Sequence, residues 1–188
     1  KDADRINAFF VSVDPERDTP AILAETLAAL DAARARVGEP TQVIVVVNGA
    51  AIERYAELAR RHADIEWMHA SEPLGFGGAI ARGLARVQHD WVYLLNSDMR
   101  LDADALAALL PWRRDDVFAL GSQIFQLSAD GRREETGFVD WYVDPSGISA
   151  YHAGVRDEAV PYPLLCAGGG AALFRTALLR RYVGSARC

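Results

Sequence analysis

The chain has 188 residues, of which 51% are hydrophobic and 24% charged, and its formal net charge is −6. This composition is typical of a soluble globular protein that is long enough to bury one sizeable core. The acidic balance, with a pI of about 5.2, argues against nucleic acid as the main partner. No apolar run approaches the ~20 residues that cross a bilayer.

The first half of the chain alternates between short apolar runs and helical patterns. Strands are predicted where β-branched and aromatic residues cluster, at residues 9–13, 43–47, 65–67 and 91–95. Helices are predicted between them. In the first helix, Thr19 is the expected cap, Pro20 the first residue and Gly38 the end. Its buried stripe is expected to be Leu23, Leu27, Leu30 and Val37.

After Pro111 the pattern becomes less regular. We expect a strand at residues 117–127, a turn at Asp130-Gly131, smaller strands and loops at residues 138–151, and a core strand at residues 171–175. Thr176 is predicted to cap a short helix that runs through Tyr182. Regular alternation of strands and helices indicates an α/β fold with a mainly parallel sheet, and we expect a single domain over residues 1–188.

The triplet Asn96-Ser97-Asp98 ends the fourth apolar run. Open α/β sheets bind ligands at the carboxyl ends of their strands. A hard cation such as Mg²⁺ takes one or two carboxylates and completes its coordination with phosphate oxygens. The triplet therefore suits a metal bound together with a nucleotide diphosphate. The alternative is an ordinary polar loop after a strand.

Two glycine-rich segments are candidates for close approach to a ligand. Gly75-Phe76-Gly77-Gly78 precedes the third predicted helix, whose amino end favours anions. It lacks the Lys of a Walker loop and the full Rossmann spacing, so a tight loop packed on the sheet is an equal alternative. Gly168-Gly169-Gly170 is costly to order, so we expect a ligand or another backbone close by. A flexible connection is the alternative.

The cysteines, histidines and aromatics give weaker signals. Cys166 and Cys188 define neither a disulfide framework nor a metal site, which favours a reducing, cytoplasmic compartment. The four histidines do not lie at zinc-ligand spacing. Trp141, with Tyr142 and Tyr151, has the character of a sugar-binding wall, although a packed core of small strands uses such residues equally well. Because the chain starts at Lys1, we expect a piece of a longer protein.

In their order and spacing, these segments resemble glycosyltransferase family 2. The likeness rests on the first strand, Val47-Asn48-Gly49, the segment 73–78, Leu94 to Asp98, and the segment 168–175. It extends from about Phe9 to Tyr182 and is nearest to the bacterial rhamnosyltransferase-like and galactofuranosyltransferase-like branches. The resemblance implies a GT-A fold, the nucleotide-diphospho-sugar transferase fold, which is a Rossmann-like three-layer α/β/α sandwich. Its nucleotide-binding half would cover about residues 6–110, and an incomplete acceptor-side half about residues 111–188.

The resemblance also assigns roles to residues. Asp98 would bind Mg²⁺ or Mn²⁺ on the donor diphosphate. The donor nucleotide would be lined by Val13, Asp14, Glu16, Asn48, Gly75, Gly78, Arg82, Asn96 and Asp98. The donor sugar and the acceptor would be bordered by Gly168 and Gly169, to which the aromatic argument adds Trp141.

The implied activity is metal-dependent transfer of a sugar, with inversion, from a nucleotide-diphosphate donor to a glycan or lipid-linked acceptor. This would serve cell-wall or polysaccharide synthesis in the cytoplasm, and a lipid-linked acceptor would bring the protein peripherally to the inner face of the plasma membrane. The oligomeric state is not predicted.

The chain departs from the family pattern at Val47, Ala81 and Asn96, and most seriously near Cys188. The family's general base is usually in an acidic pair after the final glycines, and no such pair occurs before Cys188. No spacing argument makes Asp140, Asp144, Asp157 or Glu158 the base. Three readings therefore remain: a truncated transferase, a non-catalytic nucleotide-sugar or glycan-binding module, and a nucleotidyltransferase-like enzyme. The last is disfavoured because residues 14–18 lack glycine.

Overall fold

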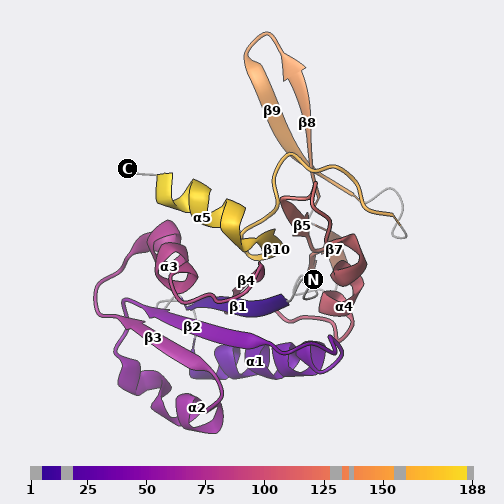
Figure 1. Cartoon of the computed structure of the whole chain (residues 1–188). Helices are drawn as coiled ribbons and strands as arrows, with labels where there is room; N and C mark the ends of the chain where they lie inside the picture. The colour runs from indigo at the N-terminus through magenta and orange to yellow at the C-terminus, as the bar shows by residue number, and fades with distance from the viewer. Residues whose placement is uncertain (1–5, 14–18, 128–132, 136–137, 155–159, 186–188) are drawn as a thin grey trace.

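The computed structural model describes residues 6–13, 19–127, 133–135, 138–154 and 160–185. A six-stranded sheet with the order β3-β2-β1-β4-β10-β5 forms its centre (Figure 1). The strands are β1 (Ile6–Val13), β2 (Gln42–Asn48), β3 (Glu66–Ala70), β4 (Trp91–Asn96), β5 (Ala119–Gly121) and β10 (Ala171–Arg175). The first four strands are mutually parallel, whereas β10 runs antiparallel to both β4 and β5.

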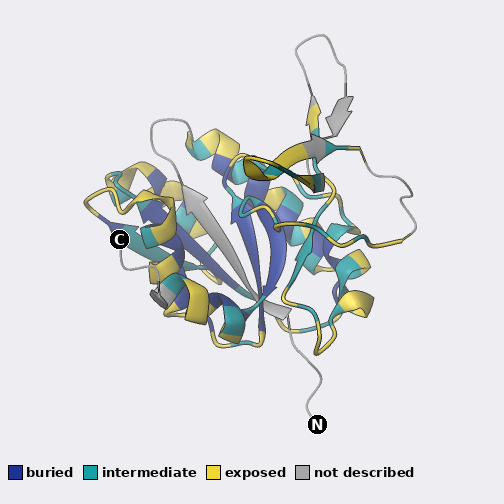
Figure 2. Ribbon diagram, turned by 90° about the horizontal axis from the view of Figure 1, so that it is seen from above, coloured by how far each residue is buried: buried dark blue, intermediate teal, exposed yellow. Residues whose placement is uncertain are grey.

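Helices cover both faces of this sheet. One face carries α1 (Pro20–Arg34), η1 (Ile52–Tyr55), α2 (Ala56–Arg61) and α4 (Ala105–Leu109), which continues as η2 (Leu110–Trp112). The other face carries α3 (Gly75–Leu84) and α5 (Thr176–Ser185). Seen from above, buried strands lie between the two helical layers (Figure 2). The predicted three-layer α/β/α sandwich with a mainly parallel sheet is confirmed.

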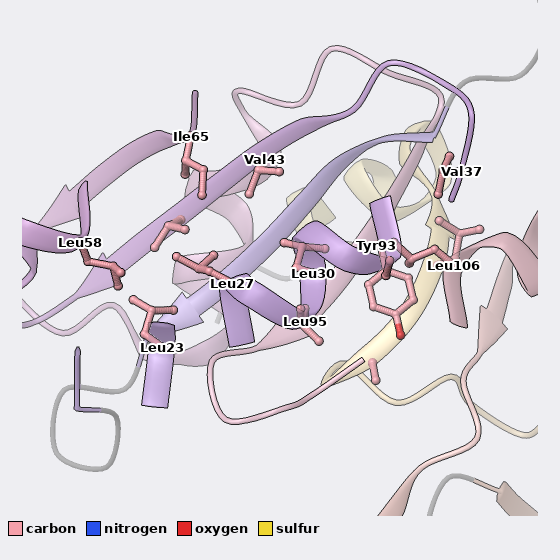
Figure 3. Close-up of a cluster of buried hydrophobic side chains, with 14 of the residues drawn as sticks. Leu23, Leu27, Leu30, Val37, Val43, Leu58, Ile65, Tyr93, Leu95 and Leu106 are labelled. Atoms are coloured by element: carbon pink, nitrogen blue, oxygen red, sulfur yellow. The ribbon is translucent and has the colours of Figure 1, made fainter. Parts of the chain in front are cut away.

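The two-sided sheet follows from strands that are apolar on both faces. Along β2, Val43, Val45 and Val47 pack with α1 and α2, whereas Ile44 and Val46 pack with α3 and α5. A strand buried on both faces reads as a continuous apolar run, as a central parallel strand should. The predicted stripe of α1, formed by Leu23, Leu27 and Leu30, is fully buried in the first of these clusters (Figure 3). Burying each leucine stabilises the fold by about 1.5–3 kcal/mol.

The start of α1 is as predicted, but its end is not. The Thr19 hydroxyl accepts a hydrogen bond from the backbone N–H of Ile22 at 3.3 Å, and Pro20 is the first helical residue. The helix ends at Arg34 rather than at Gly38, because the following residues tighten into a turn in which the Val37 N–H bonds to the Arg34 carbonyl. Gly38 then adopts a positive φ of 70°.

The predicted strand at residues 117–127 is wrong, since the segment forms two strands in two different sheets. After β5, the Ser122 N–H still bonds to the Ala171 carbonyl, and the chain then leaves the central sheet. It continues as β6 (Phe125–Leu127), which pairs with β7 (Arg133–Glu135). The turn predicted at Asp130-Gly131 lies outside the described residues.

The segment predicted as small strands forms a hairpin of β8 (Phe138–Asp144) and β9 (Gly147–Ala153), which projects from the sandwich (Figure 1). Its turn is held by the Asp144 carboxylate, which accepts hydrogen bonds from the backbone N–H of Ser146 at 2.8 Å and its hydroxyl at 2.5 Å. Gly147 adopts a φ of 124°, which favours glycine.

The last core strand, predicted at residues 171–175, is confirmed as β10, but the predicted cap of the helix after it is wrong. Thr176 is itself the first residue of α5, and its N–H donates to the Asp90 carbonyl at 2.8 Å. Its buried hydroxyl finds no hydrogen-bond partner among the described residues. Of the helices that the structure describes, none combines the length and the apolar character needed to cross a membrane.

Candidate functional site

The candidate site lies at the carboxyl edge of the parallel strands. Because β10 is antiparallel to β4, its amino end reaches this edge and brings Gly168-Gly169-Gly170 beside the end of β4. The Asn96 N–H donates to the Gly170 carbonyl at 2.8 Å. The sheet therefore joins the acidic turn and the glycine segment, which are far apart in the sequence, at the place where open α/β sheets bind ligands.

The turn at Asn96-Ser97-Asp98 is fixed from within the protein. Ser97 is buried, and its carbonyl accepts a hydrogen bond of 2.6 Å from the hydroxyl of Thr26 on α1. The Met99 N–H closes the turn by donating to the Asn96 carbonyl at 3.2 Å. Asp98 itself is exposed. A carboxylate on a rigid turn, open to solvent at a strand end, is well placed to meet a ligand.

The segment Gly75-Phe76-Gly77-Gly78 is not a loop before α3, as predicted, but the first turn of that helix. Gly75 has a φ of 66°, and α3 begins there. The side chain of Asn48, at the end of β2, accepts a 2.8 Å hydrogen bond from the Leu74 N–H and donates a 3.4 Å one to the Gly75 carbonyl. At Gly78, a Cβ would lie 2.8 Å from the Leu74 Cβ. The hydrogen bonds of Asn48, on β2, thus stabilise the start of the helix although its glycines disfavour helical structure.

The loops after β2 and β3 are tied to each other. Gly49 has a φ of 83° and donates its N–H to the Ala70 carbonyl at 2.8 Å. The His69 Nε2 lies 2.6 Å from the Ala50 carbonyl oxygen, and the guanidinium of Arg82 donates to the His69 carbonyl at 2.8 Å. Arg82, predicted on the nucleotide side, therefore braces this part of the edge.

Neighbouring side chains lie close to two of the three consecutive glycines. A Cβ on Gly169 would lie 2.9 Å from the ring of Phe76, and one on Gly170 would lie 2.9 Å from the Asn96 amide nitrogen. The close approach predicted from the sequence is made by side chains at these two positions, and at Gly170 also by the backbone of Asn96, whose N–H bonds to the Gly170 carbonyl. Gly168 is different, since a Cβ there would meet nothing within 4 Å.

Of the remaining sequence-predicted residues, the structure describes some and not others. Val13 ends β1 and pairs with Val47 in the sheet register, whereas Asp14 and Glu16 lie outside the described residues. Trp141 lies on β8, is half exposed and extends outward with the hairpin. The base of the hairpin is bonded to the segment leading into the glycines, through the Leu165 N–H and the Val139 carbonyl at 3.4 Å.

The hairpin carboxylates are engaged locally. Asp140 accepts hydrogen bonds from the Trp141 N–H at 2.8 Å and from the Tyr151 hydroxyl at 3.3 Å. The Ser146 hydroxyl, followed by its backbone N–H, holds the pKa of Asp144 below the usual range. Asp157 and Glu158 lie outside the described residues.

The carboxylate at this edge suits a cation that binds together with a phosphate-bearing ligand. Among the described residues, no group of three or more His, Cys, Asp or Glu side chains could enclose a metal ion. A hard cation needs only one or two protein carboxylates when phosphate oxygens supply the rest. The single exposed carboxylate of Asp98 fits that requirement, and a dedicated protein cage is not part of this chemistry.

Sequence reasoning missed two residues of this region. Thr26 lies inside the leucine stripe of α1, where a hydroxyl at a buried position is itself a signal that it bonds something. Phe76 lies between the glycines at the start of α3, and its ring reaches Gly169. The only signal for Phe76 was an aromatic residue inside a glycine-rich segment.

The comparisons with known proteins identify the family and the fold of the chain. The sequence model described as "Glycosyl transferase family 2" matches residues 17–183. Among the solved structures that match is the mannosyltransferase PcManGT from Pyrobaculum calidifontis in complex with GDP-Man and Mn²⁺, with a TM-score of 0.62 and 15% identity. The match covers 96% of this chain and 47% of that one, so this chain spans about half of its length. No curated protein matches the sequence. Because the family model covers most of the chain and the fold agrees, the chain belongs to glycosyl transferase family 2 and has the GT-A fold.

Proposed function

We propose that this chain binds a nucleotide-diphosphate sugar at the carboxyl edge of its sheet and forms the donor side of a glycosyltransferase. The observation that carries the proposal is the junction of the Asn96-Ser97-Asp98 turn with the glycine segment, bonded at Gly170 and anchored by Thr26. This junction holds one exposed carboxylate beside backbone that lacks side chains, an arrangement that suits a diphosphate and the sugar attached to it.

Within this site, Asp98 would hold Mg²⁺ or Mn²⁺. When bound, the divalent cation would neutralise the charge that develops on the leaving diphosphate. The first turn of α3, from Gly75 to Gly78, offers backbone N–H groups that have no partner within the helix, and the helix amino end favours an anion. Asn48 and Arg82 hold the loops that would border the nucleotide.

The reaction we propose is displacement with inversion at the anomeric carbon. A hydroxyl of a glycan or lipid-linked acceptor would attack from the side opposite the diphosphate, and a base would take its proton. Asp98 would serve the leaving group and not the nucleophile. Asp144 is a poor base because its pKa is lowered and its carboxylate is occupied by the hairpin turn. A lipid-linked acceptor would bring the protein to the inner face of the plasma membrane.

A second candidate function is a non-catalytic module that binds a nucleotide sugar or a glycan. The observation that favours it is the engagement of both Asp140 and Asp144 within the hairpin. The two candidates share donor binding and differ in turnover. Release of nucleoside diphosphate from a nucleotide sugar, accelerated by a sugar acceptor, would support the transferase. Donor binding with no release under any acceptor would support the module.

The test is calorimetric titration of UDP, dTDP and GDP into the chain, with and without Mn²⁺. The rhamnosyltransferase-like and galactofuranosyltransferase-like branches suggested by the sequence make dTDP and UDP the first choices. We expect one diphosphate to bind in a metal-dependent way, and Asp98→Ala to weaken that binding at least about tenfold, which is 1.4 kcal/mol.

A matched control is Asp116→Ala, which removes the same charge from an exposed carboxylate that pairs with Arg114 ahead of β5. It should leave binding unchanged. Two results would contradict the proposal: no binding of any diphosphate by the folded chain, or equal affinity in the wild type and in Asp98→Ala.

A further inference from the structure

Phe76 combines an exposed aromatic ring with a defined position at the site. Its side chain is 51% exposed although it belongs to the first turn of α3. Most other large apolar side chains with comparable exposure lie on the projecting hairpin, among them Trp141, Tyr142, Val143 and Ile148. Phe76 instead lies where the sheet edge gathers Asn48, Asn96 and the glycine segment.

The ring packs against the glycine that faces it. A Cβ on Gly169 would approach the Cε1 and Cζ atoms of Phe76 to 2.9 Å, closer than real Cβ atoms come. One edge of the ring therefore occupies the space that a side chain at residue 169 would need. The start of α3 and the approach to β10, which are distant in the sequence, thus meet at this contact.

Gly168, the residue before Gly169, faces open space. Gly168 is exposed, and a Cβ there would meet nothing within 4 Å. Gly170, on the other side of Gly169, packs against Asn96, which opens the turn that carries Asp98. The three consecutive glycines therefore have different neighbours: Gly169 faces the Phe76 ring, Gly170 faces Asn96, and Gly168 faces open space.

We propose that the exposed face of Phe76 contacts the apolar face of the donor's sugar ring. This inference rests on the proposed function, because it takes Asp98 as the point where the diphosphate is held. Asn48 ends β2 on one side of the site, whereas Gly169 leads into β10 beyond β4 on the other side. With the nucleoside toward β2 and the diphosphate at Asp98, the group beyond the diphosphate on the β10 side is the sugar. Apolar contact with the Phe76 ring would then make the nucleotide sugar bind more tightly than the nucleoside diphosphate alone.

The test compares the affinities of UDP, dTDP and GDP with those of UDP-galactose, dTDP-rhamnose and GDP-mannose, by calorimetry in Mn²⁺. In the wild type, the sugar-bearing form of the preferred nucleotide should bind more tightly than its diphosphate. Phe76→Ala should weaken the nucleotide sugar about threefold to tenfold, from the ordinary range of aromatic contacts, and leave the diphosphate unchanged. Phe76→Tyr should keep the preference, since the ring remains.

Two further variants separate the contact from a general effect on folding. Gly169→Ala keeps the ring but displaces it, so it should reduce the preference for the sugar-bearing form as Phe76→Ala does. Trp112→Ala removes an aromatic ring that is 37% exposed at the opposite edge of the sheet, next to Arg113, which pairs with Glu39 ahead of β2. It should change neither affinity. Circular dichroism of each variant confirms that it is folded.

The outcomes are distinct. If Phe76→Ala weakens the diphosphate and the nucleotide sugar equally, the ring contacts the nucleoside or the diphosphate and the inference is overturned, while the proposed function stands. The inference is also overturned if Phe76→Ala changes neither affinity, or if the sugar adds no affinity in the wild type. If no nucleotide binds to the folded wild type, the proposed function fails as well.

Discussion

Two buried threonines provide a matched pair for testing how the acidic turn is anchored. Thr26 and Thr176 are 1% and 2% exposed, but only the first has a bonded hydroxyl among the described residues. Thr→Val replaces a hydroxyl by a methyl of similar size, so neither variant opens a cavity. In Thr26→Val the Ser97 carbonyl loses the donor that lies 2.6 Å away and stays buried. In Thr176→Val a hydroxyl that satisfies nothing is removed.

The expected effects have different signs. Loss of one buried hydrogen bond costs about 0.5–1.5 kcal/mol, so Thr26→Val should lower the free energy of unfolding by that amount. For a chain of this size, each kcal/mol shifts the melting temperature by about 2–4 °C. Thr176→Val should leave stability unchanged or raise it, because burying an unbonded hydroxyl is itself unfavourable.

The assay is urea unfolding followed by circular dichroism, with the free energy obtained by linear extrapolation. Thr26→Val should also weaken the metal-dependent binding of nucleoside diphosphate, since the turn that carries Asp98 loses its anchor. Equal destabilisation by the two exchanges would refute the reasoning, because the hydrogen bond to Ser97 would then explain nothing.

Other consequences can be measured in the same way. Burial raises the pKa of Tyr93 to about 12, although its hydrogen bond with the Ser122 hydroxyl lowers it. The contribution of the neutral phenol to the free energy of unfolding is fully present below pH 10 and is lost as the pH rises toward 12. Between pH 9 and pH 11, the free energy of unfolding should therefore fall by about 1.4 kcal/mol more in the wild type than in Tyr93→Phe. Equal losses in urea titrations would contradict this. Gly49→Ala should destabilise more than Gly38→Ala, by at least about 1 kcal/mol. Both glycines have positive φ, but only at Gly49 would a Cβ strike a neighbour, Pro73, at 2.9 Å. Equal melting temperatures would show that Pro73 yields without cost.

Sequence patterns predicted the layers of the fold because apolar periodicity reports burial directly. The run at β2 is apolar on both faces, which is typical of a central parallel strand. The segment 117–127 was mispredicted because its apolar content does not reveal that the chain leaves the central sheet after Ser122. The start of α3 was mispredicted for a related reason, since glycine disfavours helices and the stabilising bond comes from Asn48, on another strand.

The site was predictable where a local pattern carries it. Asp98 follows a buried strand, and a strand end with a carboxylate can be read along the chain. The contact between Thr26 and Ser97 joins residues 71 positions apart, and the contact between Phe76 and Gly169 spans still more. Such pairs depend on the strand order of the sheet, with β10 inserted antiparallel beside β4. A single sequence does not specify that order.

The position of β10 also determines when the site can form. Its partner β4 ends near the middle of the chain, whereas β10 follows only after the irregular segment between them. Pairings between distant segments pay loop-closure entropy before they gain contacts, and they slow folding. During synthesis the parallel strands β1 to β4 emerge first, with one flank of β4 still lacking its neighbour. The glycine segment reaches Asn96 only when β10 docks, so a bound donor would stabilise only chains that have completed this last pairing.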